Sequence, residues 1–454
     1  MNNYDFQFED SYQGYWDIPS IGTNLPGLLY MENSSIRLEI FLNMHSTTHN
    51  TRIKEAKGYA YPKEFTKTCY YITLQELYCT KCSVFGNHQS RYTFDICSLI
   101  LTDDKDLKID SIRSFCIRMH LLDKWVWDYT CDSYNYNIPI TDQDNIIIEY
   151  TPKPSLHLIH NDEYRYYIKF GSGVTLPSAK GANITTKSFL NVEFGQNVLF
   201  DLAYRFVNQT NWLFSLLMGD STHPDFIEFR TNKSRFIYKQ SDKHLFQYIT
   251  KENETLHTSI SDFNCEDFTT IISNWIEYSN QNSESIDTFF ETLYNEHLSP
   301  SVRLKNYVSV IDGLTRCYTI AEKKGQKEGK KAQDILDILE KTKSILSKDD
   351  YNRLKMAVFR QSPKDLKVRF EKFREELENV VPFNLEEDFC LKVIGTRNHI
   401  THPSSNIINI YPREILLNVV KCIEDMIKVK ILRSIGVSTD ITKKIVRNIS
   451  LEFE

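Results

Sequence analysis

The chain has 454 residues, of which 41% are hydrophobic and 13% aromatic, and its formal net charge is −6. These values exclude an intrinsically disordered protein, and the length predicts two or three hydrophobic cores. Apolar runs such as "WLFSLLMG" are far shorter than the roughly 18–20 residues of a membrane span, and the polar start "MNNYDFQFED" is unlike a secretory signal. Ten cysteines are scattered along the chain, which favours a reduced, cytoplasmic protein without membrane contact.

The charge is unevenly distributed. Residues 301–454 hold 29 Lys and Arg against 22 Asp and Glu, a balance of +7, whereas residues 1–300 carry −13. A basic C-terminal part suits contact with a polyanion, although an ordinary solvated surface explains this balance equally well.

Residues 1–150 are predicted to be β-rich. The segments "SSIRLEIFL", "CYYITLQEL", "RYTFDICSLIL" and "IPITDQDNIIIEY" are short, rich in β-branched and aromatic residues, and bounded by turn residues. The two prolines of "TPKPS" at 151–155 place a domain boundary there. Residues 151–265 read as a mixed α+β part, with strands in 156–176 and helical spacing over 185–219.

Residues 266–454 are predicted to form a helical domain. Ser299 is a candidate N-cap, Pro300 suits the first helical turn, and Leu304, Val308 and Ile311 continue an apolar stripe. Further helices are expected at 331–347, 349–360, 363–380 and 411–436, with a lysine- and glycine-rich loop at 322–334. The predicted fold class is therefore multidomain α+β: a β-rich N-terminal region followed by an all-α bundle.

The segment "FNLEEDFCLKVIGTRNHITHP" predicts one helix of particular interest. Asn384 and Glu387 have the spacing of a capping box, and Pro403 should end the helix at His402. Apolar residues in its first half repeat at four-residue spacing, and the same two rows continue into polar residues: Leu385, Phe389, Val393, Arg397, Thr401, and Cys390, Ile394, Asn398, His402. We therefore expect Arg397, Asn398 and His402 on the buried face, and Lys392, Thr396 and His399 elsewhere.

This set of side chains fits cleavage of RNA without a metal. A guanidinium binds a phosphate through two parallel hydrogen bonds, and histidine exchanges protons near neutral pH. RNA supplies its own nucleophile, the 2′-OH. His402 would act as general base or general acid, Arg397 would stabilise charge on phosphorus, and Asn398 would orient the imidazole or hold the phosphate.

At these residues the sequence resembles the HEPN superfamily, whose ribonucleases share an R-x4-6-H motif, here Arg397, Asn398 and His402. The stretch "RLKNYVSVIDGLTRCY" is similar to an earlier helix of the ApeA-like branch, in which an acidic residue faces the motif; the matching residue is Asp312, where that branch often has Glu. Asp312 would pair with Arg397 or orient His402, or alternatively lie on a solvated flank. The segments "GYWDIPS", "LPGLLYM" and "YITLQELYC" are similar to the ApeA N-terminal region.

The resemblance implies an antiphage ribonuclease, inactive until triggered, that cleaves cellular RNA such as tRNA in abortive infection. It also implies a homodimer or higher homo-oligomer through the HEPN domain and a phage-encoded trigger sensed by the N-terminal region. A catalytically silent HEPN module that binds RNA or protein is the alternative function.

We expect no cofactor and no metal. Cys79 and Cys82 form a CxxC pair, but a zinc ribbon needs a second pair at a suitable distance, and none follows. A zinc-dependent regulator remains the third, least favoured interpretation.

Overall fold

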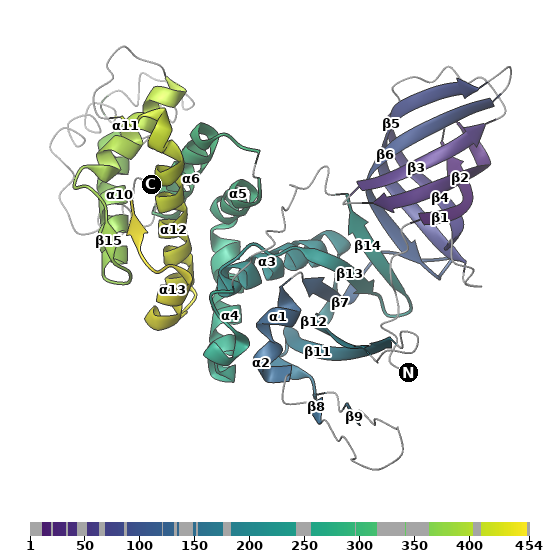
Figure 1. Cartoon of the computed structure of the whole chain (residues 1–454), viewed down its shortest axis with the longest axis horizontal. Coiled ribbons are helices and arrows are strands. Elements are labelled where there is room, and N and C mark those ends of the chain that lie inside the picture. The colour runs from purple at the N-terminus through teal and green to yellow at the C-terminus, as the bar shows by residue number, and fades with distance from the viewer. Residues whose placement is uncertain are drawn as a thin grey trace, which may run out of the picture. The chain divides into compact units, whose positions relative to one another are not determined.

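The computed structural model describes residues 11–19, 21–32, 35–42, 52–62, 69–85, 89–119, 121–130, 134–135, 149–150, 153–175, 183–241, 256–295, 297–315, 341, 363–402 and 410–451. The chain divides into two compact units, residues 1–272 and 273–454 (Figure 1). The first unit is rich in strands and the second in helices. The expected domain boundaries near residues 150 and 265 stay predictions.

A closed antiparallel barrel forms the first part of the strand-rich unit. Its strands are β1 (Ser11–Ile18), β2 (Gly22–Glu32), β3 (Ser35–Leu42), β4 (Arg52–Pro62), β5 (Tyr70–Phe85) and β6 (Gln89–Thr102). They pair in the order β6-β3-β2-β1-β4-β5, and β5 pairs again with β6 to close the ring. Closure leaves these strands without an exposed pairing edge along the ring.

Alternating side chains fill the barrel. On β1, for example, every second residue from Tyr12 to Ile18 is buried, and the three residues that alternate with them are exposed. Trp16 is fully buried, and a Cβ on Gly58 would lie only 2.4 Å from its ring. Glycine at this position therefore lets the indole pack directly against the β4 backbone.

A second antiparallel sheet continues from the barrel. Residues 90–96 of β6 pair with β3, whereas residues 98–101 pair on the same edge with β14, so that one long strand belongs to both sheets. The order is β14-β13-β7-β12-β11-β10, with bounds β7 (Ile112–Met119), β10 (Leu156–His160), β11 (Tyr164–Thr175), β12 (Asn183–Val198), β13 (Pro224–Arg230) and β14 (Arg235–Gln240).

Helix α3 (Phe200–Met218) packs on β7 and ends at Gly219, whose φ of 79° is the left-handed cap that glycine favours. The helical spacing expected over 185–219 is thus correct only for its second half. Residues 183–198 form β12, because pairing with β11 and β7 on both edges overrides the local pattern. Shorter elements of this unit are α1 (Leu122–Trp125), α2 (Trp127–Thr130), β8 (Tyr134–Asn135), β9 (Glu149–Tyr150) and the 3₁₀ turn η2 (Ile260–Asp262).

The helical unit begins within α4 (Cys265–Gln281). Its elements are α5 (Ser283–Tyr294), α6 (Pro300–Leu314), α10 (Pro363–Glu378), α11 (Phe389–Thr401), the 3₁₀ turn η3 (Arg413–Ile415), α12 (Leu416–Ser434), α13 (Thr439–Ile445) and the short parallel strands β15 (Phe383–Asn384) and β16 (Ile449–Ser450). Ser299 caps α6 as predicted, since its hydroxyl accepts from the Val302 amide. The stripe residues Leu304, Val308 and Ile311 are buried.

The predicted α+β class, with a β-rich N-terminal region and a helical C-terminal one, is confirmed. The helices expected at 331–347 and 349–360 and the loop at 322–334 fall outside the described residues, apart from residue 341. Among the described helices, none is long and apolar enough to cross a membrane.

Candidate active site

Helix α11, which carries the predicted motif, begins later than the sequence suggests. Its N-cap is Asp388, without a side-chain cap, and the expected capping box of Asn384 and Glu387 is wrong. Asn384 instead belongs to β15 and pairs with Ser450. Pairing of Asn384 with the strand β16 therefore prevails over its use as a helix cap. The predicted end is confirmed, because α11 stops at Thr401 and His402 is its C-cap.

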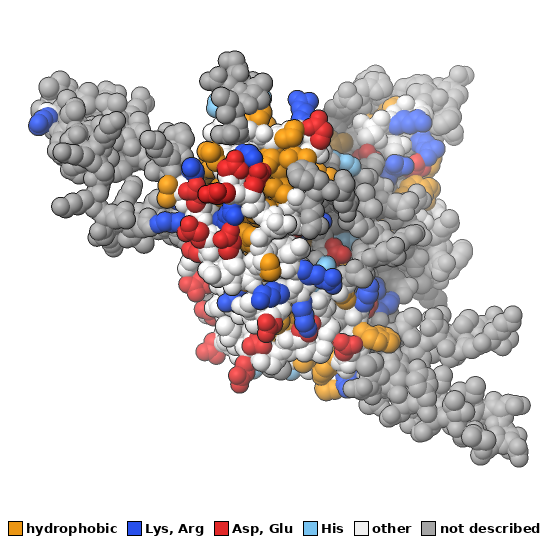
Figure 2. Space-filling model, turned by 60° about the vertical axis from the view of Figure 1, so that its left-hand side comes forward, with side chains coloured by type: hydrophobic (Ala, Val, Ile, Leu, Met, Phe, Trp, Pro, Cys, Tyr) orange, Lys and Arg blue, Asp and Glu red, His pale blue; other side chains and the backbone are white. Residues whose placement is uncertain are grey.

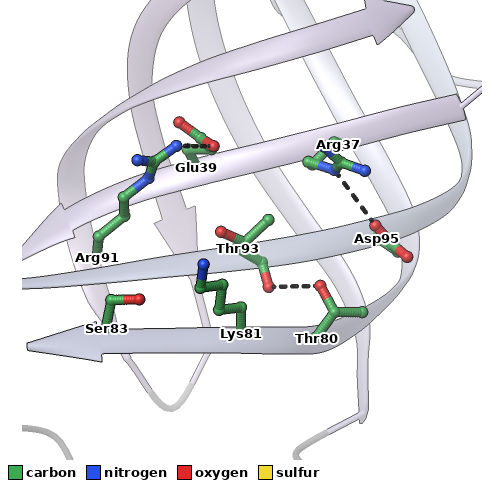
Figure 3. Close-up of a pocket in the computed structure, with 8 residues that line it drawn as sticks. All are labelled: Arg37, Glu39, Thr80, Lys81, Ser83, Arg91, Thr93 and Asp95. Carbon is green, nitrogen blue, oxygen red and sulfur yellow. Dashed lines mark hydrogen bonds and ion pairs between the residues drawn. The ribbon is translucent and has the colours of Figure 1, made fainter.

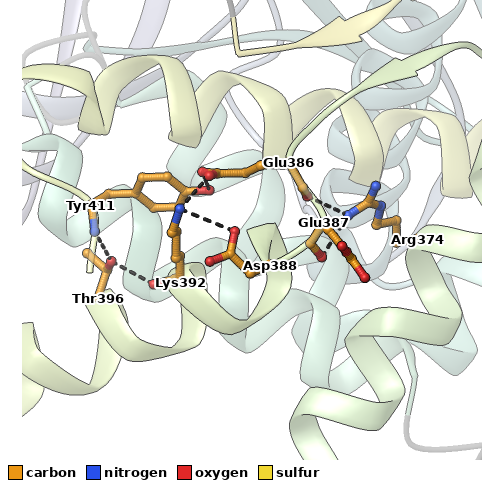
Figure 4. Close-up of polar contacts among 7 residues, drawn as sticks. All are labelled: Arg374, Glu386, Glu387, Asp388, Lys392, Thr396 and Tyr411. Carbon is orange, nitrogen blue, oxygen red and sulfur yellow. Dashed lines mark hydrogen bonds and ion pairs between the residues drawn. The ribbon is translucent and has the colours of Figure 1, made fainter. Parts of the chain in front are cut away.

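The N-terminal half of α11 is held by a network of polar contacts (Figure 4). The Lys392 ammonium pairs with Glu386 and lies 3.2 Å from Asp388. The Tyr411 hydroxyl donates to the other oxygen of Glu386 at 2.7 Å, and Lys392 lies over the Tyr411 ring. These contacts attach α11 to the segment that precedes α12.

Thr396 completes this network one residue before the motif. Its hydroxyl accepts from the Tyr411 amide at 2.8 Å and donates to the Lys392 carbonyl at 2.7 Å. Thr396 is 3% exposed, so the expectation that it points away from the core is wrong. The physical reason is that the returning chain at Tyr411 covers a second side of α11.

Arg397 and Asn398 lie together at the end of this helix. Both are half-buried, and Arg397 Nη1 donates to Asn398 Oδ1 at 3.0 Å. Arg397 Nε is buried and has no hydrogen-bond partner. A buried donor without a partner costs about 1–3 kcal/mol, so it either stores strain or awaits a ligand. A phosphate oxygen is a suitable acceptor for this guanidinium.

The two histidines of the motif are placed differently from the prediction. His402, expected on the buried face, is exposed, whereas His399, expected on the surface, is half-buried with Nδ1 buried and without a partner. His402 has φ −136° and ψ 83°, so the backbone leaves the helix there and the four-residue row does not continue to its side chain. His402 remains adjacent to Asn398, whose carbonyl accepts from the His402 amide at 2.7 Å.

Asp312 has a different partner from the one expected. Its carboxylate pairs with Arg369 of α10, while Arg397 Nη1 donates to Asn398 Oδ1. The Arg369 side chain is 3% exposed and that of Asp312 is 20% exposed. The ion pair therefore links α6 to α10. Both helices pack against α11, so the pair stabilises the surroundings of the motif.

Arg369 was missed by the sequence analysis, although a signal was present. It lies four and eight residues before Phe373 and Leu377, which are buried on the same row of α10. A charged residue on an apolar row predicts a buried ion pair. The sequence of α10 thus contains enough information to predict a buried ion pair at Arg369.

Charged side chains of both signs lie on the surface of the described residues. On the face shown in Figure 2, acidic side chains gather along one margin, and Lys and Arg side chains lie in small groups. Many lysines of the basic C-terminal part fall in residues 316–340 and 342–362, outside the described ranges.

Cys79 and Cys82 of the CxxC pair face the inside of the barrel. Both pack against its hydrophobic core. Burial raises the pKa of the Cys79 thiol, and neighbouring Cys82 adds to this. Both thiols therefore take part in the packing of the barrel interior.

Two family profiles match the chain. "ApeA N-terminal domain 1" matches residues 11–275, and "Apea-like HEPN" matches residues 305–441, which contain Asp312, Arg369 and the whole of α11. The helical unit is thus a HEPN domain, a class whose members are generally ribonucleases. The chain belongs to the ApeA family, whose HEPN domain marks a nuclease-like antiphage defence protein. No curated protein and no solved structure was found to match it.

Proposed function

We propose that this protein is a metal-independent endoribonuclease that cleaves cellular RNA, with transfer RNA as the first candidate, in an abortive-infection response to phage. The observation that carries the proposal is the Arg397 guanidinium, which bonds Asn398 through Nη1 while its buried Nε lacks a partner. A phosphodiester at this helix end would supply the missing acceptor.

The chemistry is an internal transesterification. The 2′-oxygen forms a bond to phosphorus while the bond from phosphorus to the 5′-oxygen breaks, which leaves a 2′,3′-cyclic phosphate and a 5′-hydroxyl. A base accepts the proton of the 2′-OH, and an acid gives a proton to the departing 5′-oxygen. Arg397 stabilises the negative charge that develops on the phosphorane oxygens, and Asn398 positions Arg397 or the phosphate.

His402 is the proposed proton-transfer group. Its exposure at the C-cap of α11 suits a side chain that must reach a large substrate. One chain offers one such histidine in the motif, so a homodimer or higher homo-oligomer through the HEPN domain would bring a second copy and supply both acid and base. The N-terminal unit would keep the nuclease inactive until it senses a phage-encoded trigger.

The test compares the two histidines of the motif. Purified wild-type protein is incubated with total tRNA in EDTA, and the products are sequenced from their 5′-hydroxyl ends. We expect His402→Ala to abolish cleavage and His399→Ala, the matched control three residues earlier, to retain most of it. Loss of cleavage in His399→Ala alone would transfer the role to the half-buried histidine.

The alternative function is a silent HEPN module that binds RNA or protein as a scaffold. The same variants separate the two functions. A scaffold would give no cleavage products with the wild type under any condition, including infected cells, while Arg397→Ala would still weaken RNA binding in a filter-binding assay. The ribonuclease proposal requires products from the wild type and their loss in Arg397→Ala.

A further inference from the structure

A polar pocket lies on the outer wall of the barrel, in the unit that the nuclease chemistry does not use (Figure 3). Its volume is about 490 Å³, within the range of about 300–1,000 Å³ that small-molecule sites occupy. Three neighbouring strands line it with these residues: Arg37 and Glu39 from β3, Arg91, Thr93 and Asp95 from β6, and Thr80, Lys81 and Ser83 from β5.

The register of the three strands places the side chains that line the pocket next to one another on the outer face of the barrel. Arg37 is paired with Asp95, Glu39 with Thr93, and Thr93 in turn with Lys81. The side chains between them, such as Phe94, point into the barrel core. The pocket is therefore built from the outward positions of three consecutive strands.

A β-bulge in β5 brings Lys81 to this wall. The pairing runs from Cys79 with Phe94 to Lys81 with Thr93, which leaves Thr80 as an inserted residue. Without the insertion, Lys81 would stand opposite Tyr92, whose side chain is buried in the core. Bulges that re-aim a side chain are frequent beside binding sites, and here the bulge places an ammonium group among other polar groups.

The pocket has more hydrogen-bond donors than acceptors. Arg91 donates to the nearly buried Glu39, and Arg37 Nε lies 3.6 Å from Asp95, too far for a hydrogen bond. Lys81 is exposed, and no acceptor within the described residues is recorded for its ammonium. Three cations thus face two carboxylates, and the surplus consists of one whole positive charge together with unused guanidinium N–H groups.

We infer that this pocket binds a small free ligand that carries a phosphate group. A phosphate offers several acceptor oxygens and negative charge, which matches the surplus of donors, and the hydroxyl of Ser83 adds a further donor at the rim. Lys81 binds it as a point charge, and Arg37 binds it through its planar N–H groups. The inference is independent of the nuclease chemistry, because none of these residues belongs to the HEPN domain.

Inorganic pyrophosphate is the probe for the test. Its binding to the full-length protein is followed by isothermal titration and by thermal unfolding, at an ionic strength held constant with NaCl. We expect saturable binding that weakens about tenfold in Lys81→Ala and in Arg37→Gln, the loss typical of one charged contact. The matched control is Lys57→Ala, which removes an exposed barrel lysine that pairs with Glu55 at 3.2 Å, and it should bind like the wild type.

Three outcomes would overturn the inference. The first is a wild-type response no larger than that of NaCl alone, and the second is an equal loss in Lys57→Ala, since either result means general screening. The third is a short oligouridylate that binds more tightly than pyrophosphate and depends on Lys81, because the occupant would then be an RNA strand. RNA cleavage by each variant is measured in parallel, and unchanged cleavage separates this site from the motif on α11.

Discussion

The two halves of helix α11 differ in whether their polar side chains have hydrogen-bond or ion-pair partners. In the first half, Lys392 and Thr396 are tied to Glu386 and Tyr411 by ion pairs and hydrogen bonds. At the other end, Arg397 Nε, the group proposed to bind phosphate, is buried without a partner. Both halves cross the same bundle, so packing alone does not explain the difference.

This difference distinguishes side chains that stabilise the fold from side chains that bind a ligand. Groups that only hold a fold gain by being satisfied within the chain, because an unpaired buried polar atom lowers stability. Groups that bind a ligand must keep donors available and accept that loss until the ligand arrives. Four sets of variants test whether this division holds.

The largest effect is expected at Arg397. Replacing it with Ala should lower RNA cleavage by about a hundred- to a thousand-fold, the usual cost of removing a group that stabilises transition-state charge. Arg397→Lys should recover little, since an ammonium cannot form two parallel bonds. Stability should change by less than about 1 kcal/mol, because the Arg397 side chain donates to the adjacent Asn398 and holds no distant segment in place through that bond. Single-turnover kinetics and urea unfolding measure the two effects, and a large stability loss would contradict the division.

The second effect concerns the ion pair behind the site. Asp312→Ala should lower the free energy of unfolding by about 3 kcal/mol, because it removes a carboxylate that forms an ion pair with the nearly buried Arg369. Arg369→Leu should cost clearly less, since Asp312 is 20% exposed and can be hydrated. Urea unfolding of both variants gives the order. The reverse order would show that Asp312 has its main role elsewhere, such as the predicted contact with the motif.

Thr396→Val tests the supporting half of α11 directly. The change keeps the shape of the side chain but removes the acceptor of the Tyr411 amide, and we expect a loss of about 2 kcal/mol. Cleavage under conditions where the protein stays folded should fall less than in Arg397→Ala. An equally severe loss of cleavage at unchanged stability would place Thr396 among the catalytic groups.

The smallest effect is a dependence of stability on alkaline pH. Burial, followed by the hydrogen bond to Glu386, raises the pKa of Tyr411 above its ordinary value of 10.0. The unfolded chain therefore releases this proton first, so the contribution to stability is complete below about pH 10 and is lost as the pH rises further. Tyr411→Phe should lower stability by about 1 kcal/mol at neutral pH and flatten this decline. Tyr307→Phe is a suitable comparison, since burial also raises the pKa of Tyr307.

Much of the fold was predictable from local pattern. Burial alternates from residue to residue over 35–38 of β3 and 91–97 of β6, and Ser299 and Pro300 mark the start of α6 by capping chemistry that depends on neighbouring residues alone. The predictions from local pattern were wrong where a segment pairs with a strand that is distant in the sequence. Residues 183–198 became a strand between two partners, and Asn384 paired with Ser450 instead of capping α11.

The sequence alone was enough to identify the HEPN family and to predict the end of helix α11 before Pro403, because both depend on residues that lie close together in one helix. Only the tertiary structure decided that His402 is exposed, that His399 is half-buried, and that Asp312 pairs with Arg369. It also decided that a one-residue bulge directs Lys81 into a pocket. These features depend on which distant segments cover a helix or pair with a strand. The spacing of residues along one segment does not determine this.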